Sequence, residues 1–205
     1  LLLASAFVEQ GPEEAGQMLP GGGRDMSWQE MLCQKKFYGM CAMLLCGGLS
    51  GMMVISSASD MAQVEAGFSP AAAALMVSVL SLFNAGGRAS AGILSDKLGR
   101  IGTLSLVFPI SVAALCALFF FGQDSMAVFA VSIALVGACF GALMGIFPGF
   151  TADEFGQRNN TVNYGILFFG FALSGMLGPQ VASWVMSGTG SYRSAFLIAA
   201  VVALA

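Results

Sequence analysis

The charged residues of this chain are so widely spaced that the long stretches between them carry no charge at all. A helix crosses the hydrocarbon core of a bilayer with about 20 consecutive apolar residues, and each of these stretches is long enough. Charged residues make up only 9% of the 205 residues, whereas a soluble domain carries about 25%. So few charges cannot cover a water-facing surface, which predicts an integral, multi-pass membrane protein. The stretches lie between Lys36 and Asp60, Arg100 and Asp124, Asp124 and Asp153, and Arg158 and Arg193.

This pattern predicts an all-α bundle with five complete spans and a sixth that is still apolar where the sequence stops. The predicted spans are residues 37–58, 70–94, 101–121, 125–148, 161–186 and 193–205. We expect residues 1–8 to end a preceding transmembrane helix, and residues 9–35 to form a central cytoplasmic loop before the bundle of residues 36–205. Ser27 and Glu30 fit a capping box that begins a short interfacial helix in this loop. Ser69 followed by Pro70 is typical of another helix start.

The loops between the predicted spans differ in charge. If the segment before the first span is cytoplasmic, that side receives six cations and the opposite side only Arg193. Cytoplasmic loops carry an excess of lysine and arginine, so this assignment is the favoured orientation. We expect the protein in the cell membrane. The six cations are Arg24, Lys35, Lys36, Lys97, Arg100 and Arg158.

The same composition argues against several kinds of site. The five cysteines form no CxxC pair and the chain contains no histidine, so no metal site is predicted. No nucleophile with a partnering base and no pair of buried carboxylates is evident, and we expect neither an enzyme nor a bound cofactor. No basic patch points to nucleic acid.

Arg88 is the one charge that lies away from the ends of the predicted spans. It lies about 9 Å along the helix from Leu94, at 1.5 Å per residue, and well before the polar turn predicted at residues 95–97. A charge at this depth costs several kcal/mol unless it faces water or a partner, which makes Arg88 a candidate binding residue. Asn84, four residues earlier, would share its face of the helix. Alternatively, Arg88 extends to the membrane surface or pairs with Asp96.

Glycines recur every four residues in the span 125–148, at Gly137, Gly141 and Gly145. Small residues at this spacing allow helix backbones to approach closely in lipid. Two interpretations remain open at this point. The glycines serve static packing, or they allow helices to slide as a cavity opens and closes.

Residues 92–100 match the pattern G-x-L-x-D-[RK]-x-G-[RK] at all of its defined positions. Gly92 suits a close helix approach, Gly99 suits a tight turn, and Asp96 can pair with a cation. This pattern resembles the cytoplasmic loop motif of the major facilitator superfamily, where it follows the second helix of each six-helix half. The resemblance implies that Asp96, Lys97 and Arg100 belong to a gate that helps to hold one state of an alternating-access transporter.

The chain further resembles the C-terminal half, helices seven to twelve, of transporters in the oxalate/formate antiporter family, which includes monocarboxylate and pyruvate carriers. The resemblance rests on the stretches SLFNAGGRASAGILSDKLGRIGTLSL, GIFPGFTADEFGQRNNTVNYGILFFGFALSGMLGP and SWQEMLCQKKFYGM. It implies a twelve-helix transporter whose N-terminal half is the missing partner of this chain. It also implies that Arg88 faces a central cavity and binds the carboxylate of a small organic anion.

The chain departs from the family's oxalate carriers at one position. Those carriers also bind the dianion with a lysine in helix eleven, whereas residues 169–171 of this chain are apolar. One cation suits a monocarboxylate such as pyruvate, lactate or formate better than a dianion. Tyr164, Phe168 and Phe171 are candidates for an aromatic wall of the binding site, or else they face lipid or neighbouring helices. The same alternatives apply to Phe140 and Phe147.

The positions of the carboxylates bear on whether transport is coupled to a proton or to a second anion. We expect every carboxylate to lie at a helix end rather than buried, which favours anion exchange over proton symport. A dicarboxylate antiporter of the oxalate/formate type and a non-transporting carboxylate sensor of the same fold remain alternatives.

Overall fold

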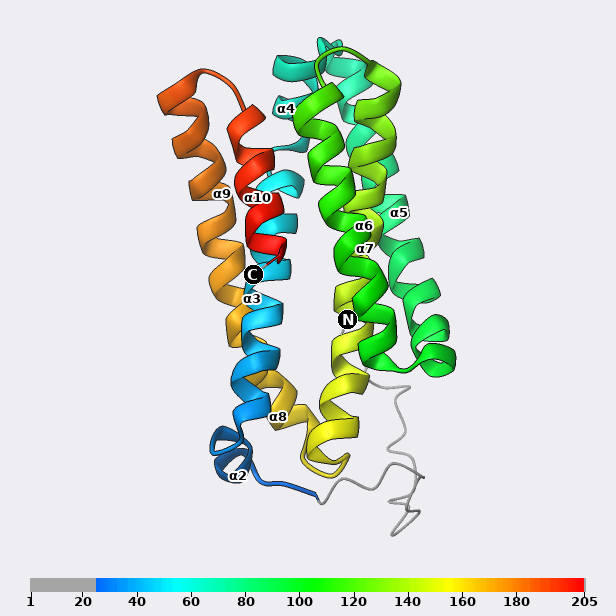
Figure 1. Cartoon of the computed structure of the whole chain (residues 1–205), viewed down its shortest axis with the longest axis vertical. Coiled ribbons are helices and arrows are strands. Elements are labelled where there is room, and N and C mark those ends of the chain that lie inside the picture. Colours follow the sequence, from blue (N-terminus) through cyan, green and yellow to red (C-terminus); the bar gives the residue numbers. More distant parts are fainter. Residues whose placement is uncertain (1–24, 205) are drawn as a thin grey trace, which may run out of the picture.

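The computed structural model describes residues 25–204, and this part of the chain consists of helices joined by short turns (Figure 1). The preceding helix predicted at residues 1–8, the first part of the predicted loop and Arg24 lie outside the described residues. The helices are α2 (Trp28–Leu32), α3 (Lys35–Ile55), α4 (Ala58–Ala66), α5 (Pro70–Leu98), α6 (Arg100–Phe121), α7 (Met126–Phe155), α8 (Asn160–Leu167), α9 (Phe169–Thr189) and α10 (Arg193–Leu204).

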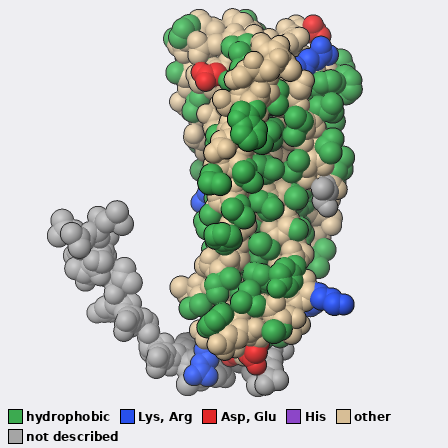
Figure 2. Space-filling model, turned by 90° about the vertical axis from the view of Figure 1, so that its left-hand side faces the viewer, with side chains coloured by type: hydrophobic (Ala, Val, Ile, Leu, Met, Phe, Trp, Pro, Cys, Tyr) green, Lys and Arg blue, Asp and Glu red, His purple; other side chains and the backbone are tan. Residues whose placement is uncertain are grey.

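Five segments are long and apolar enough to cross a membrane. They are α3, α5, α6, α7 and the consecutive helices α8 and α9, taken together as Asn160–Thr189. In the space-filling view, apolar side chains spread over the middle of the visible face and most of the visible charges lie near the two ends (Figure 2). This distribution suits a bundle whose middle lies in lipid and whose ends lie in water.

The helix α7 is the centre of the bundle. Of the residues in its most apolar stretch 61% are buried, against 17–39% in the other four membrane segments. Figure 1 shows α3, α9 and α10 on one side, and α5, α6 and α7 on the other. Large side chains of α7 belong to both apolar cores, Phe129 in the one near α4 and Phe147 in the one near α2. We call these two ends of the molecule the α4 end and the α2 end.

Both predicted helix starts are confirmed. The Ser27 side chain accepts a hydrogen bond from the backbone of Glu30, and the Glu30 side chain accepts one from the backbone of Ser27. The Ser69 hydroxyl accepts a hydrogen bond from the Ala72 amide, with Pro70 in the first turn. In both cases a serine oxygen satisfies an amide that the helix itself leaves free.

The polar turn predicted at residues 95–97 is wrong, because α5 continues through it to Leu98. The Ser95 hydroxyl donates to the Gly92 carbonyl within the helix, and Asp96 pairs with Arg100 four residues on. The chain turns only at Gly99, whose φ of 77° is a conformation that glycine adopts without strain. Polar side chains can belong to a helix where it extends into water. The polar residues 95–97 therefore did not mark the end of α5.

Three other segments also differ from the predicted spans. The span predicted at 37–58 is divided at residues 56–57 into α3 and α4, and the one at 161–186 is divided at Phe168 into α8 and α9. The helix α7 runs to Phe155 although Pro148 lies within it. Proline removes one backbone donor, and the surrounding contacts keep the helix continuous past it.

Glu65 contradicts the expectation that no carboxylate is buried, because only 8% of it is exposed. Its Oε1 accepts hydrogen bonds from the Ser191 hydroxyl and the Tyr192 amide, and its Oε2 accepts one from the Gln123 side chain. These donors come from the turns before α10 and α7, so Glu65 joins α4 to both turns. Three donors compensate for the loss of water around the carboxylate.

Tyr192 lies beside this network, between α9 and α10. Burial raises the pKa of its phenol, and the negative charges of Asp60 and Glu65 raise it further, whereas a hydrogen bond with Ser57 lowers it. The phenol therefore remains neutral under physiological conditions and adds no charge to the α4 end.

We predict that Glu65→Leu lowers the free energy of unfolding by about 2 kcal/mol or more, because it leaves three donors without their acceptor. The thermal unfolding midpoint of the purified full-length protein in detergent measures the change. Asp60→Leu is the matched control, since Asp60 lies on the same helix and is exposed. Equal midpoints for the two variants would contradict the structural role of Glu65.

Candidate functional site

Arg88 lies within the membrane-spanning helix α5, ten residues before its end at Leu98, and its side chain is exposed. Among the described residues it forms no ion pair or hydrogen bond. The alternative pairing with Asp96 is wrong, because the Asp96 carboxylate lies 2.9 Å from Arg100 Nη1. Arg88 therefore presents a guanidinium whose charge no described carboxylate neutralises.

The backbone of α5 at this level rests directly on α7. A methyl group placed at Gly145 would lie 2.7 Å from the Arg88 carbonyl oxygen, and one at Gly141 would overlap the carbonyl of Asn84. The predicted close approach at these glycines is confirmed, and it places the turn that carries both candidate polar residues against the most buried helix. Asn84 is half-buried and its side chain forms no hydrogen bond with another described residue. Whether the contact is static or sliding stays a prediction.

Four aromatic rings form a continuous row from α8 across α9 to α7. The ring centroids of Tyr164 and Phe168 lie 5.4 Å apart, those of Phe168 and Phe171 4.7 Å, and those of Phe171 and Phe140 5.8 Å. Tyr164 also interacts electrostatically with Arg88. We call these four residues the aromatic row, and Tyr164 is the member that lies within electrostatic range of the guanidinium.

The other aromatic candidates do not belong to this row. Phe147 is fully buried and packs edge-on against Phe150, so it belongs to the apolar core of the α2 end. Phe169, next to Phe168, is 64% exposed and points away from the interior. The sequence alone could not distinguish these rings, since a phenylalanine looks the same in a core, at a lipid face or in a site.

At the α2 end, Arg100 joins three helices. Its Nη1 donates to Asp96 Oδ1 on α5 at 2.9 Å, and its Nε donates to Asp153 Oδ2 on α7 at 2.9 Å. Arg100 also donates to the Ser95 hydroxyl. Lys97 of the same motif is exposed. Arg100 and Asp96 thus form the ionic contact expected of this motif, and the sequence analysis missed Asp153, the partner contributed by α7.

No helix of residues 25–204 makes the close approach expected at Gly92. Among these residues, nothing outside its own helix lies within 4 Å of the place where its side chain would be, so the role of Gly92 stays a prediction. A second ion pair, between Lys36 and Glu154, joins α3 to α7 at the same end. The two consecutive acidic residues Asp153 and Glu154 are the sequence signal that could have indicated these contacts.

The segment before α2 is fastened to the turn between α7 and α8. The Met26 amide donates to the Phe155 carbonyl, and the Met26 carbonyl accepts hydrogen bonds from the side chains of Asn159 and Asn163. Asn163 is fully buried and directly precedes Tyr164. These contacts hold the first turns of α8, which carry Tyr164.

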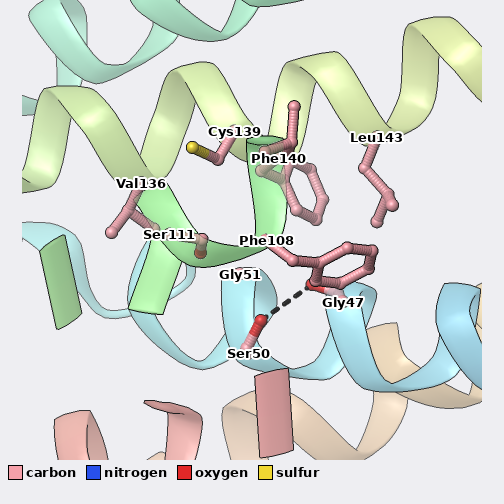
Figure 3. Close-up of a pocket in the computed structure, with 10 residues that line it drawn as sticks. Gly47, Ser50, Gly51, Phe108, Ser111, Val136, Cys139, Phe140 and Leu143 are labelled. Carbon is pink, nitrogen blue, oxygen red and sulfur yellow. Dashed lines mark hydrogen bonds between the residues drawn. The ribbon is translucent and has the colours of Figure 1, made fainter. Parts of the chain in front are cut away.

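Two cavities of the described part do not form the candidate site. One, between α3, α6 and α7, has a volume of about 10 Å³ and room for a single water at most. Figure 3 shows the Phe140 ring at its wall and the Ser50 hydroxyl bonded to the Gly47 carbonyl. A second, of about 510 Å³, is an apolar groove between α6 and α7. Neither is lined by Arg88, and no group of three potential metal ligands occurs among residues 25–204.

The amino-acid sequence of this chain is similar to those of known proteins. The family model described as Major Facilitator Superfamily matches residues 40–205. The chain belongs to this superfamily. It is an all-α, multi-pass membrane protein of the superfamily, and its helical segments and the family match are consistent with a location in the cell membrane.

Three curated relatives show how much of the chain is similar to known proteins. An uncharacterized MFS-type transporter, YhjX, of Escherichia coli (strain K12) is 34% identical over 150 residues, 73% of this chain and 37% of the relative. The oxalate:formate antiporter of Oxalobacter formigenes is 25% identical over 203 residues, 98% of this chain and 48% of the relative. Monocarboxylate transporter 12 of Xenopus laevis is 26% identical over 66% of this chain and 30% of the relative. The chain thus spans about half the length of these relatives or less.

We predict that the substitution Asp153→Asn in this superfamily member changes its free energy of unfolding by less than about 1 kcal/mol. The Arg100 and Asp153 side chains are 24% and 52% exposed, and ion pairs so open to solvent contribute little to stability. Thermal unfolding of the full-length protein in detergent measures this. A loss as large as that expected for Glu65→Leu would show that the contact has mainly a structural role.

Proposed function

We propose that this chain provides half of a secondary active transporter for small organic anions, and that monocarboxylates such as pyruvate, lactate or formate are its substrates. The observation that carries the proposal is the exposed guanidinium of Arg88 on a membrane helix, without an ionic partner among the described residues and within electrostatic range of Tyr164. A charge in this position is costly in lipid unless it faces water or an anionic ligand.

Arg88 is suited to bind the carboxylate. The guanidinium presents a planar fork of donors that can hold both oxygens of one carboxylate in parallel hydrogen bonds. Tyr164 lies within electrostatic range of Arg88, and we propose that its hydroxyl takes part in the same site. Asn84, one turn earlier on α5, is the further candidate for a hydrogen bond to the ligand. The site thus offers one full positive charge and neutral donors, which matches a monoanion.

The aromatic row is suited to the rest of the ligand. Phe168 and Phe171 present apolar ring surfaces next to Tyr164, where a methyl group or another small apolar part would lose contact with water. A second carboxylate at that place would be buried against the rings without a cation, at a cost of several kcal/mol. This is the physical reason for favouring a monocarboxylate over oxalate.

The relatives support the same class of ligand. One is named an oxalate:formate antiporter and another a monocarboxylate transporter. Since the chain spans half or less of their lengths, we propose that a second, N-terminal half faces Arg88 and encloses it in a cavity. Alternating exposure of this cavity to the two sides of the membrane would then carry the anion across.

We predict that Arg88→Gln lowers the uptake efficiency for labelled pyruvate, lactate or formate by at least tenfold, because it removes a charged hydrogen-bonding partner. Uptake by the full-length transporter in proteoliposomes, with oxalate tested beside the monocarboxylates, measures this. Arg193→Gln is the matched control, since Arg193 is an exposed arginine at the α4 end that lies over the Phe119 ring.

Each outcome of this experiment decides between classes of function. Loss of monocarboxylate uptake in Arg88→Gln, with oxalate ignored by the wild type, supports the proposal. Efficient oxalate transport favours the dicarboxylate antiporter. Ligand binding without accumulation in vesicles favours a sensor, and wild-type uptake by Arg88→Gln excludes Arg88 as the anion site.

We further propose that the Arg100 contacts with Asp96 and Asp153 form a latch that stabilises one state of the transport cycle. Asp153→Asn should then lower the maximal rate of uptake by about fivefold or more, as expected for the loss of a coupling energy of 1–3 kcal/mol. The KM should stay within about twofold of the wild type, because Asp153 is remote from the anion. A raised KM with an unchanged maximal rate would contradict the latch.

A further inference from the structure

We propose that Gly145 and Gly149 on α7 are positioning residues, of which Gly145 sets the place of Arg88 and Gly149 that of the Arg100 guanidinium. The inference rests on the functions proposed above for the two arginines. It goes beyond them because it makes one helix responsible for the placement of both the anion site and the latch.

The contact at Gly145 involves only the backbone of α5. A methyl group at Gly145 would lie 2.7 Å from the carbonyl oxygen of Arg88 and 3.1 Å from its Cα atom. Backbone atoms cannot turn aside as a flexible side chain can, so any side chain at position 145 must move α5 itself. Because the Arg88 side chain has no hydrogen-bonding partner among the described residues, its location depends on where α5 lies.

The contact at Gly149 involves a side chain instead. The Arg100 guanidinium occupies the space where a side chain of residue 149 would be, with Nη2 3.0 Å and Cζ 3.1 Å from the methyl position. Asp153 follows one turn later on α7 and accepts a hydrogen bond from Arg100 Nε at 2.9 Å. The helix α7 therefore supplies both the flat surface on which the guanidinium lies and the carboxylate that it binds.

The two contacts are one helical turn apart, about 6 Å along α7 at 1.5 Å per residue. This spacing fixes Arg88 and Arg100 relative to the same rigid helix. The repeat of glycines as such does not explain this arrangement, because Gly137 belongs to the repeat and touches neither arginine. A methyl group at Gly137 would lie 2.8 Å from the carbonyl oxygen of Leu80, a contact of the same kind two turns away from Arg88.

Uptake of labelled pyruvate by the full-length transporter in proteoliposomes tests the proposal with three alanine variants. We expect Gly145→Ala to raise the KM by at least fivefold. We expect Gly149→Ala to leave the KM within twofold and to lower the maximal rate by at least threefold. The matched control Gly137→Ala should leave the KM within twofold, whatever its effect on the thermal unfolding midpoint.

A mutant cycle separates positioning from general packing. If Gly149 acts through the Arg100–Asp153 contact, Gly149→Ala should have no further effect on the maximal rate in an Asp153→Asn background. The contact at Gly149 involves a flexible side chain, so Gly149→Ala can be tested even if Gly145→Ala does not fold. It then still tests whether α7 positions Arg100. An undiminished further loss in that background would overturn the role of Gly149.

The outcome for Gly145 is distinguishable from a failure of the proposed function. Equal rises in KM for Gly145→Ala and Gly137→Ala, or a wild-type KM in Gly145→Ala while Arg88→Gln abolishes uptake, would overturn the positioning role alone. Wild-type uptake by Arg88→Gln would overturn the proposed anion site and the positioning role together.

Discussion

The direct backbone contact between α5 and α7 is the constraint on which the rest of the site depends. Membrane helices gain no hydrophobic energy by associating in lipid, so close van der Waals contact and the small residues that allow it hold them together. Here Gly141 and Gly145 let the backbone at Asn84 and Arg88 lie flush against the most buried helix. The helical turn of α5 that carries Asn84 and Arg88 is thus held in place. These polar side chains would be unstable on a loosely packed surface that faces lipid.

The charges near the two ends of the bundle contrast with Arg88. Arg100 is bound by two carboxylates, and Lys36 is bound by Glu154. Glu65 is buried among neutral donors from two turns. Such contacts join helices, whereas the one guanidinium in the middle of a span lacks an ionic partner among the described residues. This difference is the physical basis for assigning a ligand to Arg88 and structural or gating roles to the charges at the ends.

The aromatic row connects the two sides of the bundle at the level of this arginine. Phe140 comes from the central helix, and its ring meets Phe171 of α9, while Phe168 marks the break between α8 and α9. Asn163, fastened to the Met26 carbonyl, holds the turn from which Tyr164 projects. The ligand class proposed for the site therefore depends on contacts from segments far apart in the sequence.

The sequence by itself determined the membrane class, the superfamily motif and two helix starts, and it singled out Arg88. Hydropathy, capping and motif spacing are properties of a few neighbouring residues, so they can be recognised without a fold. Only the tertiary structure decided that α5 continues through Asp96, that no other helix of the described part approaches Gly92, and that Asp153 binds Arg100. It also decided that Glu65 is buried and which phenylalanines form a row. Each of these depends on how helices distant in sequence pack together, and no local pattern encodes that packing.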